Sequence, residues 1–197
     1  MPLSAWCPPR TRLAAVAVVL SAPLFTACAP ASGDPIPAAA AAVNTSTSHN
    51  DADVRFSQEM IPHHQQTIQM AELVATRTSN EYVLAVSEHL IDDERTEIRQ
   101  MTKWLQSWKA QVPQENAKST HSMPGMLSQQ QMATMARQSG AEFDRTWLTL
   151  LSTHLGHGIV MVENVQAKGE HQPTLDLAGK LLTGQRRQIA EIATHLD

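Results

Sequence analysis

The sequence has few cysteines, few aromatic residues and no block of basic charge. Of its 197 residues only two are cysteine, Cys7 and Cys28, so nothing after residue 28 can form a disulfide framework or supply a reactive thiol. Aromatic residues make up 4% of the chain, whereas a β-sandwich is rich in aromatic and β-branched residues. The net charge is −4 without a basic stripe, which argues against a nucleic-acid partner.

The sequence also lacks the motifs of the common enzyme classes. It contains no Glu-x-x-His of di-iron bundles, no HExxH, no GxSxG and no phosphate-binding glycine loop. Glu94 and Glu97 form an acidic pair one helical turn apart, a pattern typical of a solvated face or of local ion-pair partners. We therefore expect a protein that is not an enzyme.

The N-terminal residues have the pattern of an export signal. Arg10 and Arg12 precede an apolar stretch that ends at Phe25 and is shorter than the roughly 20 apolar residues of a membrane span. The small residues Thr26 and Ala27 before Cys28 resemble a bacterial lipobox, in which the cysteine is acylated, for example with palmitate. We expect a signal peptide over residues 1–27 and a lipid anchor on Cys28. A plain secretory signal with an incidental cysteine is the alternative.

The remaining chain divides into a tether and a helical domain. Residues 28–50 are mostly Ala, Pro, Ser, Thr and Asn, and this composition predicts a disordered tether. Over residues 51–197 the apolar residues follow helical spacing. We predict main helices over about 51–77, 79–109, 141–168 and 174–197. Thr78 and Glu81 are the predicted capping box of the second helix, and Ser128 and Gln131 that of a short extra helix.

An internal repeat relates the two halves of this domain. A shift of 91 residues, the distance from His63 to His154, aligns many positions without a gap, including Met70 with Met161 and Arg95 with Arg186. Each half, over about residues 51–110 and 141–197, is therefore predicted to be one helical hairpin. Two hairpins that bury their apolar faces against each other form an all-α four-helix bundle.

Methionine and histidine residues share one face on two of the predicted helices. That face also carries apolar residues, so it is expected to point into the bundle. Thioether sulfur favours Cu(I), and imidazole suits copper, zinc and other transition metals. The mixed set without cysteine predicts a copper site, with Cu(I) as the favoured ion and zinc as the second choice. The candidate metal ligands are Met60, His63, His64, Met70, Met101, His154, His157 and Met161.

The same residues also have ordinary structural interpretations. Methionine at helical spacing commonly fills a core, and a buried histidine commonly makes hydrogen bonds within it. The alternative function is therefore a metal-free helical interaction module of the cell envelope, and a metalloenzyme with an unrecognised site is a third possibility. His121, Met123 and Met126, in the connection between the hairpins, form a second candidate copper site.

Several motifs resemble those of the domain of unknown function 305 family. They are Asp53-x-x-Phe56, Met60-Ile61-Pro62-His63-His64, Ile68-x-Met70-Ala71, Glu97-Ile98-x-x-Met101-x-x-Trp104-Leu105, Met123-Pro124-Gly125-Met126 and Gly140-x-x-Phe143-Asp144. The resemblance covers about residues 51–197. It implies a ferritin-like helical bundle in an exported protein, with copper binding reported in some members and no established enzymatic activity.

The second half of the chain departs from the family pattern. Where the family repeats a Met-Ile-x-His-His motif, this chain has Leu151-Ser152-Thr153-His154-Leu155, with a further histidine at 157. Gln188 and Ile192 stand where Glu97 and Met101 would recur. Either the metal site is therefore unequal between the halves, or this member has drifted toward a purely structural role. We expect an exported, membrane-anchored protein for copper sequestration, delivery or tolerance. Its partners would be the metal ion and the membrane, while a homo-oligomer or an envelope partner stays open.

Overall fold

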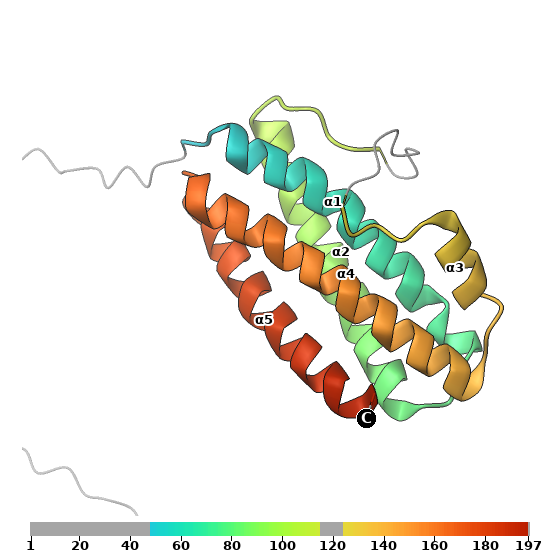
Figure 1. Cartoon of the computed structure of the whole chain (residues 1–197). Helices are drawn as coiled ribbons and strands as arrows, with labels where there is room; N and C mark the ends of the chain where they lie inside the picture. Colours follow the sequence, from blue (N-terminus) through green and yellow to red (C-terminus); the bar gives the residue numbers. More distant parts are fainter. Residues whose placement is uncertain (1–47, 115–123, 197) are drawn as a thin grey trace, which may run out of the picture. The chain divides into compact units, whose positions relative to one another are not determined.

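The computed structural model describes residues 48–114 and 124–196, and within these ranges the secondary structure is helical. The elements are α1 (Asp51–Glu72), the 3₁₀ turn η1 (Val74–Thr76), α2 (Glu81–Ser107), α3 (Gln129–Met135), α4 (Gly140–Lys168) and α5 (Gln172–Leu196). The four long helices form a bundle, and α3 lies beside it in the connection between the hairpins (Figure 1). None of these helices is long and apolar enough to span a bilayer.

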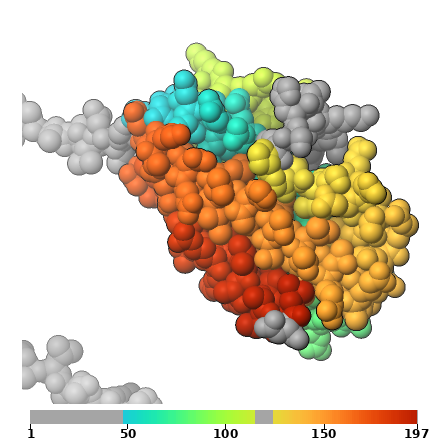
Figure 2. All heavy atoms as spheres, in the orientation of Figure 1, coloured from blue at the N-terminus to red at the C-terminus, as the bar shows by residue number. Residues whose placement is uncertain are grey.

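The bundle consists of two hairpins that meet through their first helices. α1 packs along α2, α4 packs along α5, and α1 meets α4 at the centre. α2 and α5 make few direct contacts with each other. In the space-filling view, α4 runs between α1 and α5 across one face of the molecule (Figure 2). The predicted all-α bundle of two hairpins with a short extra helix is confirmed.

Local capping explains where the helices begin. The side chain of Asn50 accepts hydrogen bonds from the backbone of Ala52 and Asp53, and this caps α1. The predicted capping box of Ser128 and Gln131 starts α3 as expected. By contrast, the capping box predicted from Thr78 is wrong.

Asn80, rather than Thr78, is the N-cap residue of α2. Its side chain accepts from the backbone amides of Tyr82 and Val83, whereas the Thr78 hydroxyl accepts from the amide of Asn80. Asparagine ranks above threonine as an N-cap, so α2 begins at Glu81 rather than at residue 79. The first helix also ends earlier than predicted, at Glu72, and η1 fills the turn.

Matched contacts show that the repeat is structural as well as sequential. Arg95 Nη2 donates to Glu72 Oε1 at 3.0 Å in the first hairpin. At the positions 91 residues later, Arg186 Nη2 donates to Glu163 Oε1 at 2.8 Å. The two hairpins are therefore related by an approximate two-fold axis.

Each hairpin also holds the turn of the other. Asp53 Oδ2 accepts from the backbone amides of Glu170 and His171, at 3.0 and 3.1 Å. The equivalent carboxylate, Asp144, accepts from the Asn80 side chain at 3.2 Å. Both aspartates lie on the first helix of their own hairpin and hold the turn that leads into the second helix of the other.

The core has two apolar clusters with buried polar groups between them along α1 and α4. One cluster contains Met70 and Trp147, and the other contains Met60 and Leu105. The polar groups at the intermediate level are His63, His64, Thr67 and His154, each no more than 1% exposed. Burial of polar side chains is unfavourable unless they find partners, so this layer is the natural place to look for a site.

Candidate metal centre

His63 on α1 and His154 on α4 face each other where the two hairpins cross. His63 Nε2 lies 3.1 Å from the backbone oxygen of His154, and His154 Nε2 lies 3.1 Å from the backbone oxygen of His63. The rings are stacked, with centroids 3.6 Å apart and planes 12° apart. Since the two positions are equivalent in the repeat, the pair sits at the approximate two-fold axis.

The surroundings of both imidazoles favour the neutral form. Burial lowers the pKa of His63 well below its ordinary value, and the neighbouring His154 and His64 lower it further. Burial also lowers the pKa of His154, against the hydrogen bonds to Gly125 and His63. Neutral imidazole is the form that binds metal ions, and it carries only one N–H.

The pair therefore has more nitrogen atoms than hydrogen bonds it can make. His63 Nε2 donates to a carbonyl, which leaves its buried Nδ1 without a hydrogen-bond partner among the described residues. In His154 both nitrogens face carbonyl oxygens, since Nδ1 lies 3.0 Å from the oxygen of Gly125. One of these two contacts lacks a proton. A histidine that donates one N–H to a backbone carbonyl and offers its other nitrogen is the usual arrangement of a metal ligand.

His64 has different partners, both of them acidic residues of α2. Its Nε2 lies 2.8 Å from Glu97 Oε2, and its Nδ1 lies 3.9 Å from Glu94 Oε1. Burial acts to lower the pKa of His64, but the two carboxylates outweigh burial and raise it. Burial raises the pKa of Glu94 to about 8. Glu94 is buried, so the interpretation of the two acidic residues as a solvated face is wrong for it, and the partner of both residues is His64 of α1 rather than a local residue of α2.

Two of the predicted methionine ligands lie near the histidines. Met60 is one helical turn before His63 and therefore shares its face of α1. Met101 is one turn after Glu97 on α2. Both are fully buried in the same apolar cluster, so their thioethers lie on one side of the polar layer.

The structure does not bring Met70 and Met161 to the histidine pair. Each lies seven residues, or about 10 Å along the helix axis, from His63 or His154. α1 and α4 are antiparallel, as the hydrogen bond from Trp147 Nε1 to the Met70 carbonyl at 3.0 Å also shows. Met70 and Met161 therefore lie on opposite sides of the pair and cannot join one ion there.

The connection between the hairpins lies against the histidines of α4, His154 and His157. Gln66 holds it through two hydrogen bonds to the backbone of Leu127, at 2.9 and 2.6 Å. Gly125 has a φ of +89° and lies directly against the half-buried His157, a conformation and a proximity that favour glycine. Of the second candidate copper site, Met126 is half-buried beside Gly125, while His121 and Met123 lie outside the described residues.

Sequence reasoning missed a residue that shapes the pair. A Cβ on Gly158 would lie 2.9 Å from the Gln185 amide and 3.2 Å from His63 Cε1. Glycine at this position on α4 therefore admits the imidazole of His63. The available signal was a glycine inside an apolar helical pattern, which usually has a packing reason.

The histidine pair is not a complete metal site as it stands. Over residues 48–114 and 124–196, no group of three His, Cys, Asp or Glu side chains could hold a metal ion. A centre on His63 and His154 would require thioether sulfur, and Met60 is the nearest along the chain. The donor set fits a soft ion of low coordination number better than a hard one.

Comparison with known proteins identifies the family. The family model described as domain of unknown function (DUF305) matches residues 53–196. The chain belongs to the DUF305 family. No curated protein matches the sequence.

Solved DUF305 structures share the fold. A protein from Streptomyces coelicolor that is presumed to be secreted is 24% identical, with a TM-score of 0.67 over 74% of this chain and 90% of that one. A DUF305 fragment from Deinococcus radiodurans is 22% identical, with a TM-score of 0.67 over 75% and 96%. CopM in its Cu(I)-bound form is 24% identical, with a TM-score of 0.60 over 72% and 93%.

In this DUF305 chain the first hairpin contains a group of neighbouring residues that the second hairpin does not repeat. The first hairpin places an imidazole, two carboxylates and a thioether side by side, and the second replaces all four. The pairs are His64 and Leu155, Glu94 and Gln185, Glu97 and Gln188, and Met101 and Ile192. The histidine pair at the axis is therefore shared, whereas the acidic cluster beside it belongs to the first hairpin alone.

Proposed function

We propose that this protein is an exported copper-binding protein, anchored to the membrane through Cys28, which sequesters or delivers copper or contributes to copper tolerance. The ion would bind at the Met/His cluster, with His63 and His154 at its centre. The observation that carries this proposal is the buried Nδ1 of His63. It has no hydrogen-bond partner among the described residues, while Nε2 of the same ring is fixed by a backbone carbonyl.

The chemistry of the donors favours copper in its reduced state. Neutral imidazole nitrogen and the thioethers of Met60 and Met101 are soft or intermediate ligands, and these select Cu(I) over hard cations. The related CopM has been crystallised in Cu(I)-bound, Cu(II)-bound and silver-bound forms. Silver is also a soft ion, so the comparison supports the same class of metal here.

The ligand test compares buried and exposed histidines. We expect His63→Ala and His154→Ala each to weaken Cu(I) binding at least tenfold, equivalent to about 1.4 kcal/mol. His89 is exposed on α2, and His89→Ala should leave the affinity unchanged. The measurement is competition with a Cu(I) chelator, with Zn(II) titrated in parallel. Equal or better retention of Zn(II) would contradict the choice of metal.

One observation favours the alternative of a metal-free interaction module. The reciprocal contacts of His63 and His154 with each other's carbonyls are those of core histidines that join two hairpins. In that case both alanine variants would destabilise the protein without changing its affinity for Cu(I). Urea unfolding of the metal-free variants, measured beside the chelator competition, separates the two functions.

The anchor has its own test, because residues 1–47 lie outside the described residues. Acylation of Cys28 is the membrane attachment that the sequence predicts, so Cys28→Ser should move the protein from the membrane fraction to the soluble fraction. Cys7→Ser is the matched control and should have no effect, since Cys7 lies within the predicted signal peptide. A Cys28→Ser protein that stays in the membrane fraction would exclude the lipid anchor.

A further inference from the structure

The approximate two-fold axis gives most features of one hairpin a counterpart on the other, and α3 is an exception. This short helix packs beside α4 at the end of the bundle where α1 ends and α4 begins (Figure 1). Its Met135 is fully buried in the apolar cluster that contains Met70 and Trp147. We call the place between the last turns of α1 and the first turns of α4 the Trp147 groove, and α3 fills it.

The counterpart of the Trp147 groove has no helix over it among the described residues. It lies between the first turns of α1 and the last turns of α4, which run side by side at the surface (Figure 2). A cavity of about 420 Å³ opens there. Phe56, the residue equivalent to Trp147, lines this cavity, and we call it the Phe56 groove.

The floor of the Phe56 groove is as apolar as that of its covered counterpart. Three of its residues are equivalent to members of the cluster that holds α3, and the pairs are Phe56 and Trp147, Met161 and Met70, and Val165 and Val74. Met161 is partly exposed, whereas Met70 is fully buried. Removing apolar surface from water is favourable, so a cover that buries Met161 would be stabilised by it.

The rim of the groove differs from that of its counterpart and favours reversible occupancy. Glu59 and Asn164 are exposed where the first groove has Leu150 and Leu73, which pack against the cluster around α3. An apolar centre within a polar rim is the usual anatomy of an interface between proteins that associate and separate. The charged residues of the rim are Asp51, Glu59, Arg55 and Lys168. Because both signs are equally represented, the rim selects neither cations nor anions, and recognition falls to the apolar groups.

An exposed apolar side chain extends this surface along α4. Val160 is 54% exposed and lies one helical turn before Asn164. The equivalent residue of the first hairpin is Gln69. A single exposed apolar residue is ordinary, but this one adjoins the groove at a position where the other hairpin is polar.

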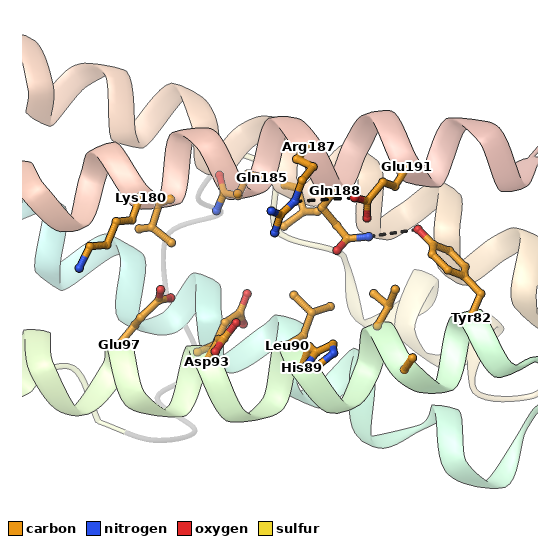
Figure 3. A pocket seen from close by; sticks show the side chains of 16 residues that line it. Tyr82, His89, Leu90, Asp93, Glu97, Lys180, Gln185, Arg187, Gln188 and Glu191 are labelled. Carbon is orange, nitrogen blue, oxygen red and sulfur yellow. Dashed lines mark hydrogen bonds and ion pairs between the residues drawn. The ribbon is translucent and has the colours of Figure 1, made fainter. Parts of the chain in front are cut away.

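A larger open groove, of about 650 Å³, runs between α2 and α5 (Figure 3). Gln188 Nε2 donates to the Tyr82 hydroxyl at 3.1 Å across it, and Glu94 in its wall has His64 as a neighbour. The two-fold axis exchanges α2 with α5 and therefore maps this groove onto itself. The molecule contains no model of an occupant for it, whereas α3 is such a model for the Phe56 groove.

We propose that the Phe56 groove binds a short amphipathic helix of another protein, seated as α3 is seated in the Trp147 groove. On α3 the apolar anchors are Met132 and Met135, three residues apart on one face of the helix. Amphipathic helices dock into apolar grooves through anchors at this spacing. The bound helix would present two such anchors, and one of them would cover Met161.

The occupant is a different protein rather than a second copy of this chain. In a second copy Met135 is already buried in its own groove, and releasing it would expose the apolar cluster that it covers. The Phe56 groove uses neither His63 nor His154. Helix binding is therefore independent of copper binding, and either one can fail without the other.

The probe for this site is a peptide with the sequence of residues 127–138, which includes α3. A hydrocarbon staple between positions 129 and 133, both exposed in α3, holds the peptide helical without touching its apolar face. Its binding to the full chain is measured by fluorescence anisotropy. A control peptide carries Met132→Ser and Met135→Ser, and we expect it to bind at least tenfold more weakly.

Variants of the protein locate the bound peptide. Met161→Glu places a charge in the floor of the groove and should weaken binding tenfold or more. Ala167 is exposed on α4 and does not line the groove, so Ala167→Glu is the matched control and should have no effect. The double variant Glu59→Leu, Asn164→Leu reproduces the apolar rim of the covered groove. It should strengthen binding of the methionine peptide at least threefold and leave the serine peptide unchanged.

Three results would overturn the proposal. The first is equal affinity for the two peptides. The second is binding that persists in Met161→Glu, which would place the peptide in the Trp147 groove with α3 displaced. The third is a concentration-dependent dimer that Met161→Glu abolishes, which would make a second copy the occupant. Should Met161→Glu fail to fold, Glu59→Leu, Asn164→Leu still decides, because it replaces exposed side chains and an unchanged affinity would contradict binding at this groove.

Discussion

Among the residues around the histidine pair, Gly158 sets how closely the His63 ring can approach α4. The neighbouring Gln185 amide and His63 Cε1 lie where even one added methyl group would be in close contact. Buried side chains in a packed core accommodate such a group only by moving off their preferred rotamers. The position of His63 therefore depends on a residue that has no side chain of its own.

We predict that Gly158→Ala destabilises the protein by about 1–3 kcal/mol, because the added Cβ overpacks the core. Gly156→Ala is the control on the same helix, since a Cβ there meets nothing within 4 Å. It should instead stabilise the helix by up to about 1 kcal/mol. Urea unfolding of both variants gives the comparison. If both stabilise the protein equally, Gly158 does not determine the position of His63.

At the scale of the helices, an aromatic cluster fixes the end of α2. Trp108 stacks on His49 with ring centroids 4.5 Å apart, and the His171 ring lies nearly perpendicular to Trp104 and Trp108, with centroids 5.3 and 5.0 Å away. His171 Nδ1 also lies 2.8 Å from Thr174 Oγ1 in the first turn of α5. The end of α2 is thus held to the start of α5 and to the residues before α1.

We predict that protonation of His171 weakens this end of the bundle. Burial lowers the pKa of His171, an effect that Asp53 opposes and His49 reinforces. As the pH falls through about 6.5, the unfolded chain therefore takes up a proton at this position before the folded protein does. The contribution of neutral His171 to stability is complete at pH 7.5 and is lost on acidification.

The measurement is the urea midpoint at pH 7.5 and at pH 5.5. His171→Gln removes this titration, so the midpoint of the wild type should fall further between the two pH values than that of the variant. His195→Gln is a control for histidine loss on α5 outside this cluster. Equal falls in the wild type and in His171→Gln would contradict the assignment.

For the molecule as a whole, the sequence predicted the helices well. It predicted poorly which residues of neighbouring helices lie at the same level and which side chains are buried. Helical periodicity and the 91-residue repeat were sufficient for the two hairpins, because both are carried by regularly spaced apolar residues. These inferences needed only the pattern along the chain. The repeat also aligned His63 with His154, but their contact depends on the packing of α1 against α4, which the sequence left open.

The errors concern what depends on the partner helix. Helical spacing predicts which face of its own helix carries Met70 or Met161. It does not predict how far each residue lies along that helix from residues of the antiparallel neighbour. The distance of both methionines from the histidine pair was therefore not predicted. The burial of Glu94 depends on His64 from another helix, and an acidic pair on a helix looks the same whether it is solvated or buried. The open groove likewise depends on how far α2 stands from α5.

The difference between the hairpins suggests how the acidic cluster contributes to the whole fold. In the first hairpin His64 contacts two carboxylates of α2, and Glu94 among them is buried. In the second hairpin the equivalent positions hold a leucine and two glutamines, and the fold is the same. The three residues are therefore expected to be coupled, so that they are tolerated together or replaced together.

We predict that His64→Leu alone destabilises the protein by about 1–3 kcal/mol, because it leaves the buried carboxyl group of Glu94 without its imidazole partner. The triple variant His64→Leu, Glu94→Gln, Glu97→Gln reproduces the residues of the second hairpin and should recover most of that loss. Urea unfolding of the single, double and triple variants gives the coupling free energy, which is expected to be about 1–3 kcal/mol. If the triple variant is as unstable as His64→Leu, the three residues act independently and their joint replacement in the second hairpin needs another cause.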